Sequence, residues 1–154
     1  MFSGIVEGLG IINSVLLKQD CLHVTIKPYI DFDDLHIGDS VSVNGVCLTV
    51  TELLDNNQFN VTIVPETLRL TNLNKIAAGS LVNLERSVTP ITRLGGHYVQ
   101  GHIDGTGEII ELTKDGQDAW ILKIKTPSRL IKYIVNKGYI AMDGMSLTVI
   151  DATE

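Results

Sequence analysis

The sequence predicts an all-β protein built from two tandem barrels, and three observations support this prediction. Short runs rich in Val, Ile, Leu and Thr alternate with Gly and with "DNN", "KDG" and "AAG", a pattern typical of strands joined by tight turns. Helical periodicity is nearly absent from the chain. The heptad "NGVCLTV" at positions 44–50 returns as "DGMSLTV" at positions 143–149, which indicates an internal repeat.

The expected elements follow one another with short turns. One helix is predicted over residues 127–138, because Pro127 suits a first turn, Leu130, Ile131 and Ile134 share a face, and Gly138 ends the pattern. The repeat implies one short helix in each copy. The expected strands are β-branched and apolar runs bounded by turn signals, namely residues 4–14, 22–27, 40–52, 58–64, 81–86, 101–112, 119–125 and 141–150.

The repeat extends beyond the heptad. "GIVEGLG" at positions 4–10 aligns with "GHIDGTG" at positions 101–107 at an offset of 97, and Pro28 aligns with Pro127 at an offset of 99. The order of the motifs is kept while the offset drifts, as in tandem copies whose loops have changed. We therefore predict an N-terminal barrel over residues 1–97 and a C-terminal barrel over residues 98–154.

The two copies differ in length. The first continues for 37 residues from Val50 to Ser87, whereas the second has five residues after Val149. About three strands of ordinary length have no counterpart. We therefore expect two six-stranded Greek-key barrels, the second of them incomplete in this sequence.

Composition excludes several functional classes. A formal net charge of −6 disfavours a nucleic-acid partner, and no apolar run approaches the roughly 20 residues of a membrane span. The N-terminus lacks a basic leader before its apolar residues, which favours a cytoplasmic protein. Cys21 and Cys47 are the only cysteines, and we expect two free thiols.

Five motifs in order carry a specific resemblance. They are "MFSGIVEGLG", "NGVCLTV", "PETLRLTNL", "GGHYVQGHIDG" and "YIVNKGYIAMDGMSLTV". With the duplication, they make the chain similar to the riboflavin synthase family (alpha-type chain) along all 154 residues. The lumazine-binding antenna proteins of luminous bacteria share the two-barrel plan and are the alternative, as is an inactive ligand-binding fragment.

The resemblance implies a fold and an activity. Family members have two six-stranded Greek-key barrels, assemble as homotrimers and bind their substrates between subunits. They dismutate two molecules of 6,7-dimethyl-8-ribityllumazine by transfer of a four-carbon unit, which yields riboflavin and 5-amino-6-ribitylamino-pyrimidinedione. They use no metal and no cofactor. These properties are expectations for this chain.

The heptads place small polar groups opposite apolar ones. Side chains alternate along an extended strand, so Leu48 and Val50 face the barrel interior while Cys47 and Thr49 face the other way. By resemblance the polar face contacts ligand. The second copy repeats this parity with Leu147 and Val149 against Ser146 and Thr148.

Two histidines are candidates for proton transfer. His97 and His102 lie five positions apart, so a regular strand would place them on opposite faces unless Gly101 breaks its register. A zinc site with Cys47 is disfavoured, because no ligand pair has the short spacing of structural sites. His102 aligns with Ile5, in a segment that by resemblance contacts the ligand, and it is the preferred acid or base.

The predicted site combines both copies. By resemblance His102, Cys47, Ser146 and Lys137 form the catalytic set, and Lys137 reaches the substrate across the subunit interface. The segment "TIVPET" at positions 62–67 ends in a Pro-containing turn. The resemblance implies that it forms a pocket wall, with Glu66 and Thr67 as expected hydrogen-bonding partners for ribityl hydroxyls. The remaining substrate-binding candidates are Phe2, Ser3, Gly4, Ile5, Val6, Leu48, Thr49, Thr62, Ile63, Val64, Pro65, His97, Gly101, Ile103, Asp143, Leu147 and Thr148.

The exchanges between the copies point to different roles. Asn44 corresponds to Asp143, and Cys47 corresponds to Ser146. Two chemically different environments can direct identical substrates toward opposite roles. Which barrel binds the donor is left open.

Overall fold

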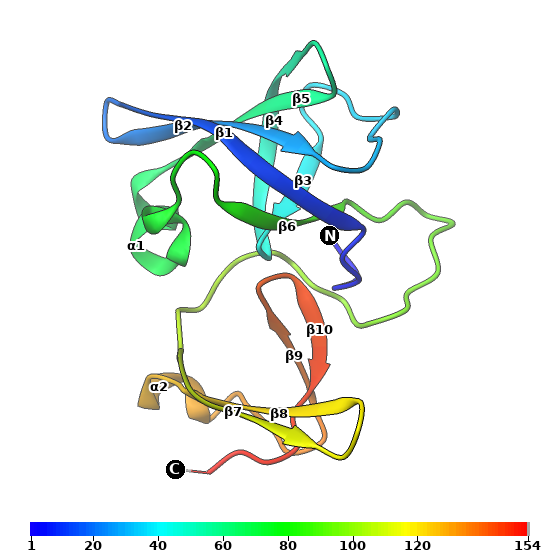
Figure 1. Cartoon of the computed structure of the whole chain (residues 1–154), viewed down its shortest axis with the longest axis vertical. Helices are drawn as coiled ribbons and strands as arrows, with labels where there is room; N and C mark the ends of the chain where they lie inside the picture. The colour runs from blue at the N-terminus through cyan, green and yellow to red at the C-terminus, as the bar shows by residue number, and fades with distance from the viewer. Residues whose placement is uncertain (154) are drawn as a thin grey trace.

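A closed six-stranded barrel dominates the computed structural model, which describes residues 1–153 and confirms the all-β class (Figure 1). The strand order is β1-β2-β5-β4-β3-β6, and the barrel closes where Gly8–Ile11 of β1 pair with Leu81–Leu84 of β6. All pairings are antiparallel. The strands are β1 (Gly8–Lys18), β2 (Cys21–Pro28), β3 (Ser40–Val43), β4 (Val46–Leu54), β5 (Gln58–Ile63) and β6 (Leu81–Arg86).

The hydrophobic core lies inside this barrel. Alternate residues of each strand point inward, and every buried member of the core falls between Ile12 and Leu84. Leu48 and Val50 are buried in it, whereas Cys47 is half-buried and Thr49 exposed. The predicted parity of the first heptad is therefore confirmed.

Each heptad begins in a hairpin turn rather than inside a strand. Asn44 and Gly45 have φ angles of 47° and 81°, and Asp143 and Gly144 have 45° and 85°. Paired positive φ values match the tight hairpin turn that favours Asn-Gly and Asp-Gly. The prediction of one continuous strand over residues 40–52 and another over residues 141–150 was wrong. Each range contains this turn and forms two strands that pair with each other.

A helical connection joins β5 to β6. The helix α1 (Pro65–Leu70) begins at the proline for which we predicted only a turn, and a 3-10 helix, η1 (Asn72–Lys75), follows. Proline suits a first helical position because its fixed φ is helical and no N–H is required there. The Thr71 hydroxyl accepts a hydrogen bond from Leu73 N at 3.3 Å and so caps η1.

The second repeat reproduces the first four strands. The hairpins β7 (Glu108–Asp115) with β8 (Ala119–Lys125) and β9 (Tyr139–Met142) with β10 (Met145–Thr148) correspond in order to β1–β4. Within residues 1–153 they form two separate two-stranded sheets below the barrel in Figure 1. Two predicted strands began too early, because residues 4–7 and 101–107 lie outside β1 and β7.

The predicted helix over 127–138 is mostly wrong. Only α2 (Ser128–Ile131) is helical, and it follows β8 whereas α1 follows β5, so the two short helices are not equivalent. At residues 137 and 138 the backbone bonds instead to Val149, which directly follows β10: Lys137 N donates to Val149 O at 2.8 Å and Val149 N to Gly138 O at 2.9 Å. Lys137 also has a positive φ of 64°, which ends a right-handed helix.

The two repeats exchange their leading segments. Phe2 and Val99, equivalent at the offset of 97, pair with each other through Phe2 N to Val99 O at 2.8 Å and Val99 N to Phe2 O at 3.0 Å. Gly4 O then accepts from Ser146 N at 2.7 Å, and Gly101 O accepts from Cys47 N at 2.8 Å. Each heptad is therefore covered by the leading segment of the other repeat.

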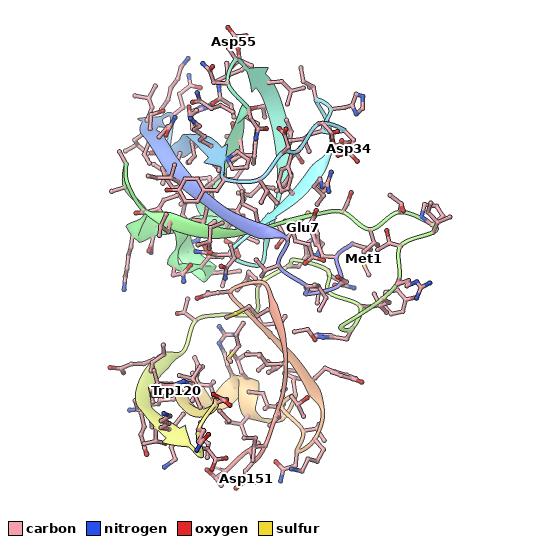
Figure 2. All side chains as sticks on the ribbon, turned by 45° about the vertical axis from the view of Figure 1, so that its right-hand side comes forward. Met1, Glu7, Asp34, Asp55, Trp120 and Asp151 are labelled. Atoms are coloured by element: carbon pink, nitrogen blue, oxygen red, sulfur yellow. The ribbon has the colours of Figure 1, made fainter. Side chains whose placement is uncertain are left out.

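In Figure 2, Met1 and Glu7 lie at the end of the first barrel that faces the second repeat, whereas Trp120 and Asp151 lie in the second repeat. Among residues 1–153, the helices are too short or too polar to cross a membrane.

Candidate functional site

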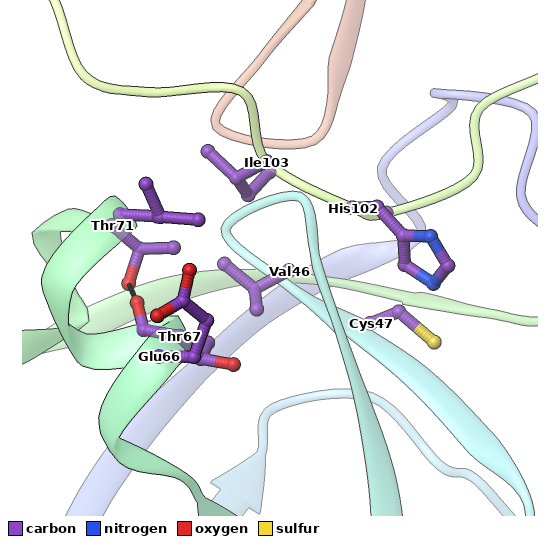
Figure 3. A pocket seen from close by; sticks show the side chains of 9 residues that line it. Val46, Cys47, Glu66, Thr67, Thr71, His102 and Ile103 are labelled. Carbon is purple, nitrogen blue, oxygen red and sulfur yellow. Dashed lines mark hydrogen bonds between the residues drawn. The ribbon is translucent and has the colours of Figure 1, made fainter.

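A pocket of about 210 Å³ opens where the exchanged segment 101–103 crosses the first barrel (Figure 3). Its walls come from the start of β4, from α1 and from the segment itself. The lining residues are Val46, Cys47, Glu66, Thr67, Leu70, Thr71, Gly101, His102 and Ile103. Six of these nine are predicted site residues, which are brought together from three separate parts of the chain.

The close approach of Gly101 places His102 at the pocket. Gly101 has a φ of +82°, and a Cβ there would lie 2.7 Å from the Cys47 Cβ. A glycine is required for both reasons, since other residues disfavour this φ and would collide with β4. Residues 101–107 lie outside any strand, so the expected break of a strand register at Gly101 does not arise. In Figure 3 the His102 and Cys47 side chains lie at one end of the pocket.

The opposite wall is the first turn of α1. Glu66 and Thr67 face the pocket, and the Glu66 carboxylate accepts a hydrogen bond from Arg69 Nε at 3.1 Å. Thr71 Oγ1 donates to the backbone oxygen of Thr67 at 2.7 Å, which fixes the end of the helix. This wall offers a carboxylate and a hydroxyl to a polyhydroxylated chain, while Val46 and Leu70 give an apolar floor.

The pocket combines a proton-transfer group with hydrogen-bonding groups. An imidazole can donate or accept a proton near neutral pH, and the thiol of Cys47 is close to it in the lining. Ligand sites commonly pair a largely apolar surface with a few polar groups in this way. The lining thus offers an imidazole, a thiol, a carboxylate and two hydroxyls beside apolar side chains to a small ligand.

A second cluster lies on the opposite heptad. His97 Nδ1 and Ser146 Oγ are 2.7 Å apart, and the His97 ring stacks on Tyr139 with centroids 5.2 Å apart. Gly4, the counterpart of Gly101, has a φ of +74° and would bring a Cβ to 2.7 Å from the Ser146 Cβ. The two predicted histidines therefore serve different heptads, His102 the first and His97 the second.

Several predicted binding residues do not line the pocket. Ile63 is in the barrel core with Leu48, and Phe2 is fully buried against Val99. Thr62 is on the outer barrel surface with its hydroxyl 3.2 Å from His23 Nδ1. The others outside the lining are Ser3, which is buried, Val6 and Pro65, which are half-buried, and Ile5, Thr49 and Val64, which are exposed.

The predicted residues of the second repeat are also outside this pocket. Lys137 is exposed at the turn before β9. Asp143 accepts a hydrogen bond from Asn72 Nδ2 at 3.2 Å through its carboxylate and from Asn83 Nδ2 at 2.8 Å through its backbone oxygen. Leu147 is half-buried and Thr148 exposed on β10. The roles of all these residues stay predictions.

Sequence reasoning missed four residues of interest. Val46, Leu70 and Thr71 line the pocket, and the periodicity of α1 would have identified the last two as neighbours of Thr67. Glu85 is buried and accepts three hydrogen bonds from the N-terminal segment. Glu85 lies on the face of β6 opposite to the core residues Val82 and Leu84, so strand alternation predicts an outward charge and gives no signal of its burial.

An ion-pair network ties the residue before β1 to the end of β6. The Arg86 side chain donates to the Glu7 carboxylate at 2.6 and 3.0 Å and also bonds to Asp34. The hydrogen bonds with Glu7 are the main cause that raises the pKa of Arg86 above its ordinary value, with a smaller effect of Asp34. The guanidinium of Arg86 therefore stays charged at any physiological pH.

Comparisons with known proteins agree on one family. A family model described as lumazine binding domain matches residues 3–87 and 100–154. A riboflavin synthase of Actinobacillus pleuropneumoniae is 46% identical over 154 residues, which cover 100% of this chain and 71% of that protein. A riboflavin synthase of Schizosaccharomyces pombe is 48% identical over 150 residues, which cover 97% of this chain and 72% of that protein.

Solved structures show the same arrangement. A crystal structure of LumP complexed with riboflavin superposes with a TM-score of 0.84 at 28% identity, and covers 96% of this chain and 79% of its own. A crystal structure of LumP complexed with 6,7-dimethyl-8-(1'-D-ribityl) lumazine superposes with a TM-score of 0.81 at 27% identity. The match covers 96% of this chain and 78% of the LumP chain.

Proposed function

The chain belongs to the riboflavin synthase family of lumazine-binding proteins, and on that premise we propose that it acts as a riboflavin synthase. The reaction joins two identical substrates. A four-carbon unit leaves one 6,7-dimethyl-8-ribityllumazine and is added to the other, so that riboflavin and 5-amino-6-ribitylamino-pyrimidinedione are formed.

The observation that carries this proposal is the pocket built from both repeats. His102 and Cys47 meet there although they are 55 positions apart, and Glu66 and Thr67 line the same pocket. The imidazole of His102 exchanges a proton with the ring methyl group of the substrate. Glu66 and Thr67 hydrogen-bond the ribityl hydroxyls, which need both donors and acceptors.

The size of the pocket supports a shared site. Its volume of about 210 Å³ is below the roughly 300–1,000 Å³ of typical small-molecule sites. The first barrel therefore covers part of the ligand, and a second substrate or subunit covers the rest. Ser146, Lys137 and Asp143 act on the second substrate, in the environment that the second heptad provides.

Conversion of the lumazine tests the proposal directly. The purified protein is incubated with 6,7-dimethyl-8-ribityllumazine, and riboflavin is followed by its absorbance and identified by chromatography. Two moles of lumazine consumed per mole of riboflavin formed support the enzyme. Bound lumazine that persists without product would refute it.

A non-catalytic binding role is the second candidate. It is favoured by the similarity to LumP, whose structures carry riboflavin and a ribityllumazine. Tight riboflavin binding by fluorescence titration, together with no turnover at any protein concentration, supports this role instead. The homotrimer and the cytoplasmic location expected from the resemblance stay predictions, which light scattering and cell fractionation test.

A further inference from the structure

Glu85 is a buried carboxylate between the two repeats that the proposed chemistry does not use. It lies on β6 with 4% of its surface exposed. Its Oε1 accepts from Ser3 N at 2.6 Å and Ser3 Oγ at 2.7 Å, and its Oε2 accepts from Gly4 N at 3.1 Å. A buried carboxylate is costly unless hydrogen bonds compensate, so these three donors fasten the N-terminal segment to β6.

Two consecutive peptide groups extend this contact to the second repeat. The peptide group between Phe2 and Ser3 gives its N–H to the carboxylate, while its oxygen accepts from Val99 N at 3.0 Å. The next group gives the Gly4 N–H to the carboxylate, while its oxygen accepts from His97 N at 3.0 Å. Because a peptide group is planar and rigid, a shift of the Glu85 carboxylate is passed on to the backbones of Val99 and His97.

The same segment also holds the second heptad. Gly4 O accepts from Ser146 N at 2.7 Å, and Ser146 Oγ lies 2.7 Å from His97 Nδ1. Space around it is closed, because a Cβ on Gly96 would lie 2.2 Å from Ser3 O. The backbones of Ser146 and His97 are therefore both attached to the segment that the buried carboxylate fastens.

We propose that Glu85 is a positioning residue, which holds the N-terminal segment so that His97 and Ser146 of the second repeat keep their mutual hydrogen bond. A residue of the first barrel thereby sets the geometry of the second heptad. The use of that pair on a ligand rests on the proposed function, whereas the positioning itself does not.

Glu85→Gln tests the proposal with little change of shape. The amide keeps one acceptor for Ser3, but its NH₂ group cannot accept from Gly4 N. The readout is the ¹⁵N spectrum of the His97 imidazole at a fixed alkaline pH, since a defined hydrogen bond at Nδ1 favours one tautomer. We expect the separation of its two nitrogen resonances to shrink, because the Ser146 bond loosens.

Internal controls separate positioning from general destabilisation. The resonances of His23, on the far side of the first barrel beside Thr62, keep their wild-type values in Glu85→Gln. Glu52→Gln removes a carboxylate that bonds to Asn60 on the outer barrel surface, and it leaves His97 unchanged. Unchanged His97 resonances in folded Glu85→Gln would overturn the proposal.

A second variant covers a failure to fold. Ser3→Ala removes the hydroxyl donor to the carboxylate, together with a longer bond of 3.3 Å that the hydroxyl accepts from Ile5 N. We expect a smaller shift of His97 in the same direction; no shift there overturns the proposal as well. Riboflavin titration of the wild type is run in parallel. If the His97 resonances shift in the variants but the wild type does not bind riboflavin, the positioning role is supported and the proposed function is refuted. If the wild type binds riboflavin but the resonances do not shift in the variants, the positioning role alone is refuted.

Discussion

Replacement of Gly101 by alanine tests whether the close approach of the exchanged segment builds the pocket. Two costs apply at this position. A non-glycine residue at its φ of +82° costs about 1–2 kcal/mol. The added Cβ would also meet the Cys47 Cβ at 2.7 Å and Cys47 N at 2.9 Å, and overpacking of this kind costs about 1–3 kcal/mol more.

Gly79→Ala provides the matched control. Gly79 has a similar φ of +90°, but nothing lies within 4 Å of its added Cβ. We therefore expect about 1–2 kcal/mol of destabilisation for Gly79→Ala and about 2–5 kcal/mol for Gly101→Ala. The free energy of unfolding is measured by urea denaturation of both variants and the wild type.

Ligand binding gives the second measurement. Since Gly101 lines the pocket between Cys47 and His102, we expect Gly101→Ala to weaken riboflavin binding by about tenfold or more, or about 1.4 kcal/mol, while Gly79→Ala leaves it unchanged. Fluorescence titration of folded protein measures the affinity. A difference in stability below about 0.5 kcal/mol between the variants, with equal affinities, would refute the close-approach argument.

Three further predictions concern the core, the ion pairs and proton transfer. Leu84→Ala should cost about 2–5 kcal/mol in urea unfolding, because Leu84 is fully buried; a cost no larger than that of Leu16→Ala, at an exposed site of the same barrel, would contradict this. Glu7→Gln should lower the free energy of unfolding by about 1 kcal/mol in the same assay. This loss should exceed that of Glu111→Gln, because the ion pair of Glu111 with a lysine is more exposed. Equal losses would argue against a stabilising effect of the partly buried network. His102→Gln should lower the rate of riboflavin formation more than riboflavin affinity, since proton transfer is lost while shape is kept; an unchanged rate would remove His102 from the catalytic set.

The fold was largely predictable because strand signals are local. Alternation of apolar and polar residues follows from the two-residue period of an extended chain, and it correctly assigned Leu48 and Val50 to the core. The tandem heptads indicated the repeat, and β7–β10 follow the order of β1–β4. The dipeptides Asn44-Gly45 and Asp143-Gly144 were the local signal that we missed, because Asn-Gly and Asp-Gly are strong hairpin markers. The positive φ values of Asn44 and Asp143 agree with such turns.

The site was predictable only in part. Cys47, Glu66 and His102 were identified from the motifs, and all three line the pocket. The separation of His97 from His102 depends on where the exchanged segment crosses the barrel. No periodicity within either segment contains that information, because the partners of both histidines lie on distant strands.

By itself, the sequence determined which residues face inward, where the repeat begins again and which chemical groups are available. These properties depend on neighbours within a few positions along the chain. Only the tertiary structure decided that each heptad is covered by the leading segment of the other repeat, and that Glu85 fastens one of these segments. The predicted helix over 127–138 ended early for the same reason, since the backbone of Lys137 and Gly138 bonds to Val149. Hydrogen bonds between distant residues form only after the chain has folded, and here they override the local preference.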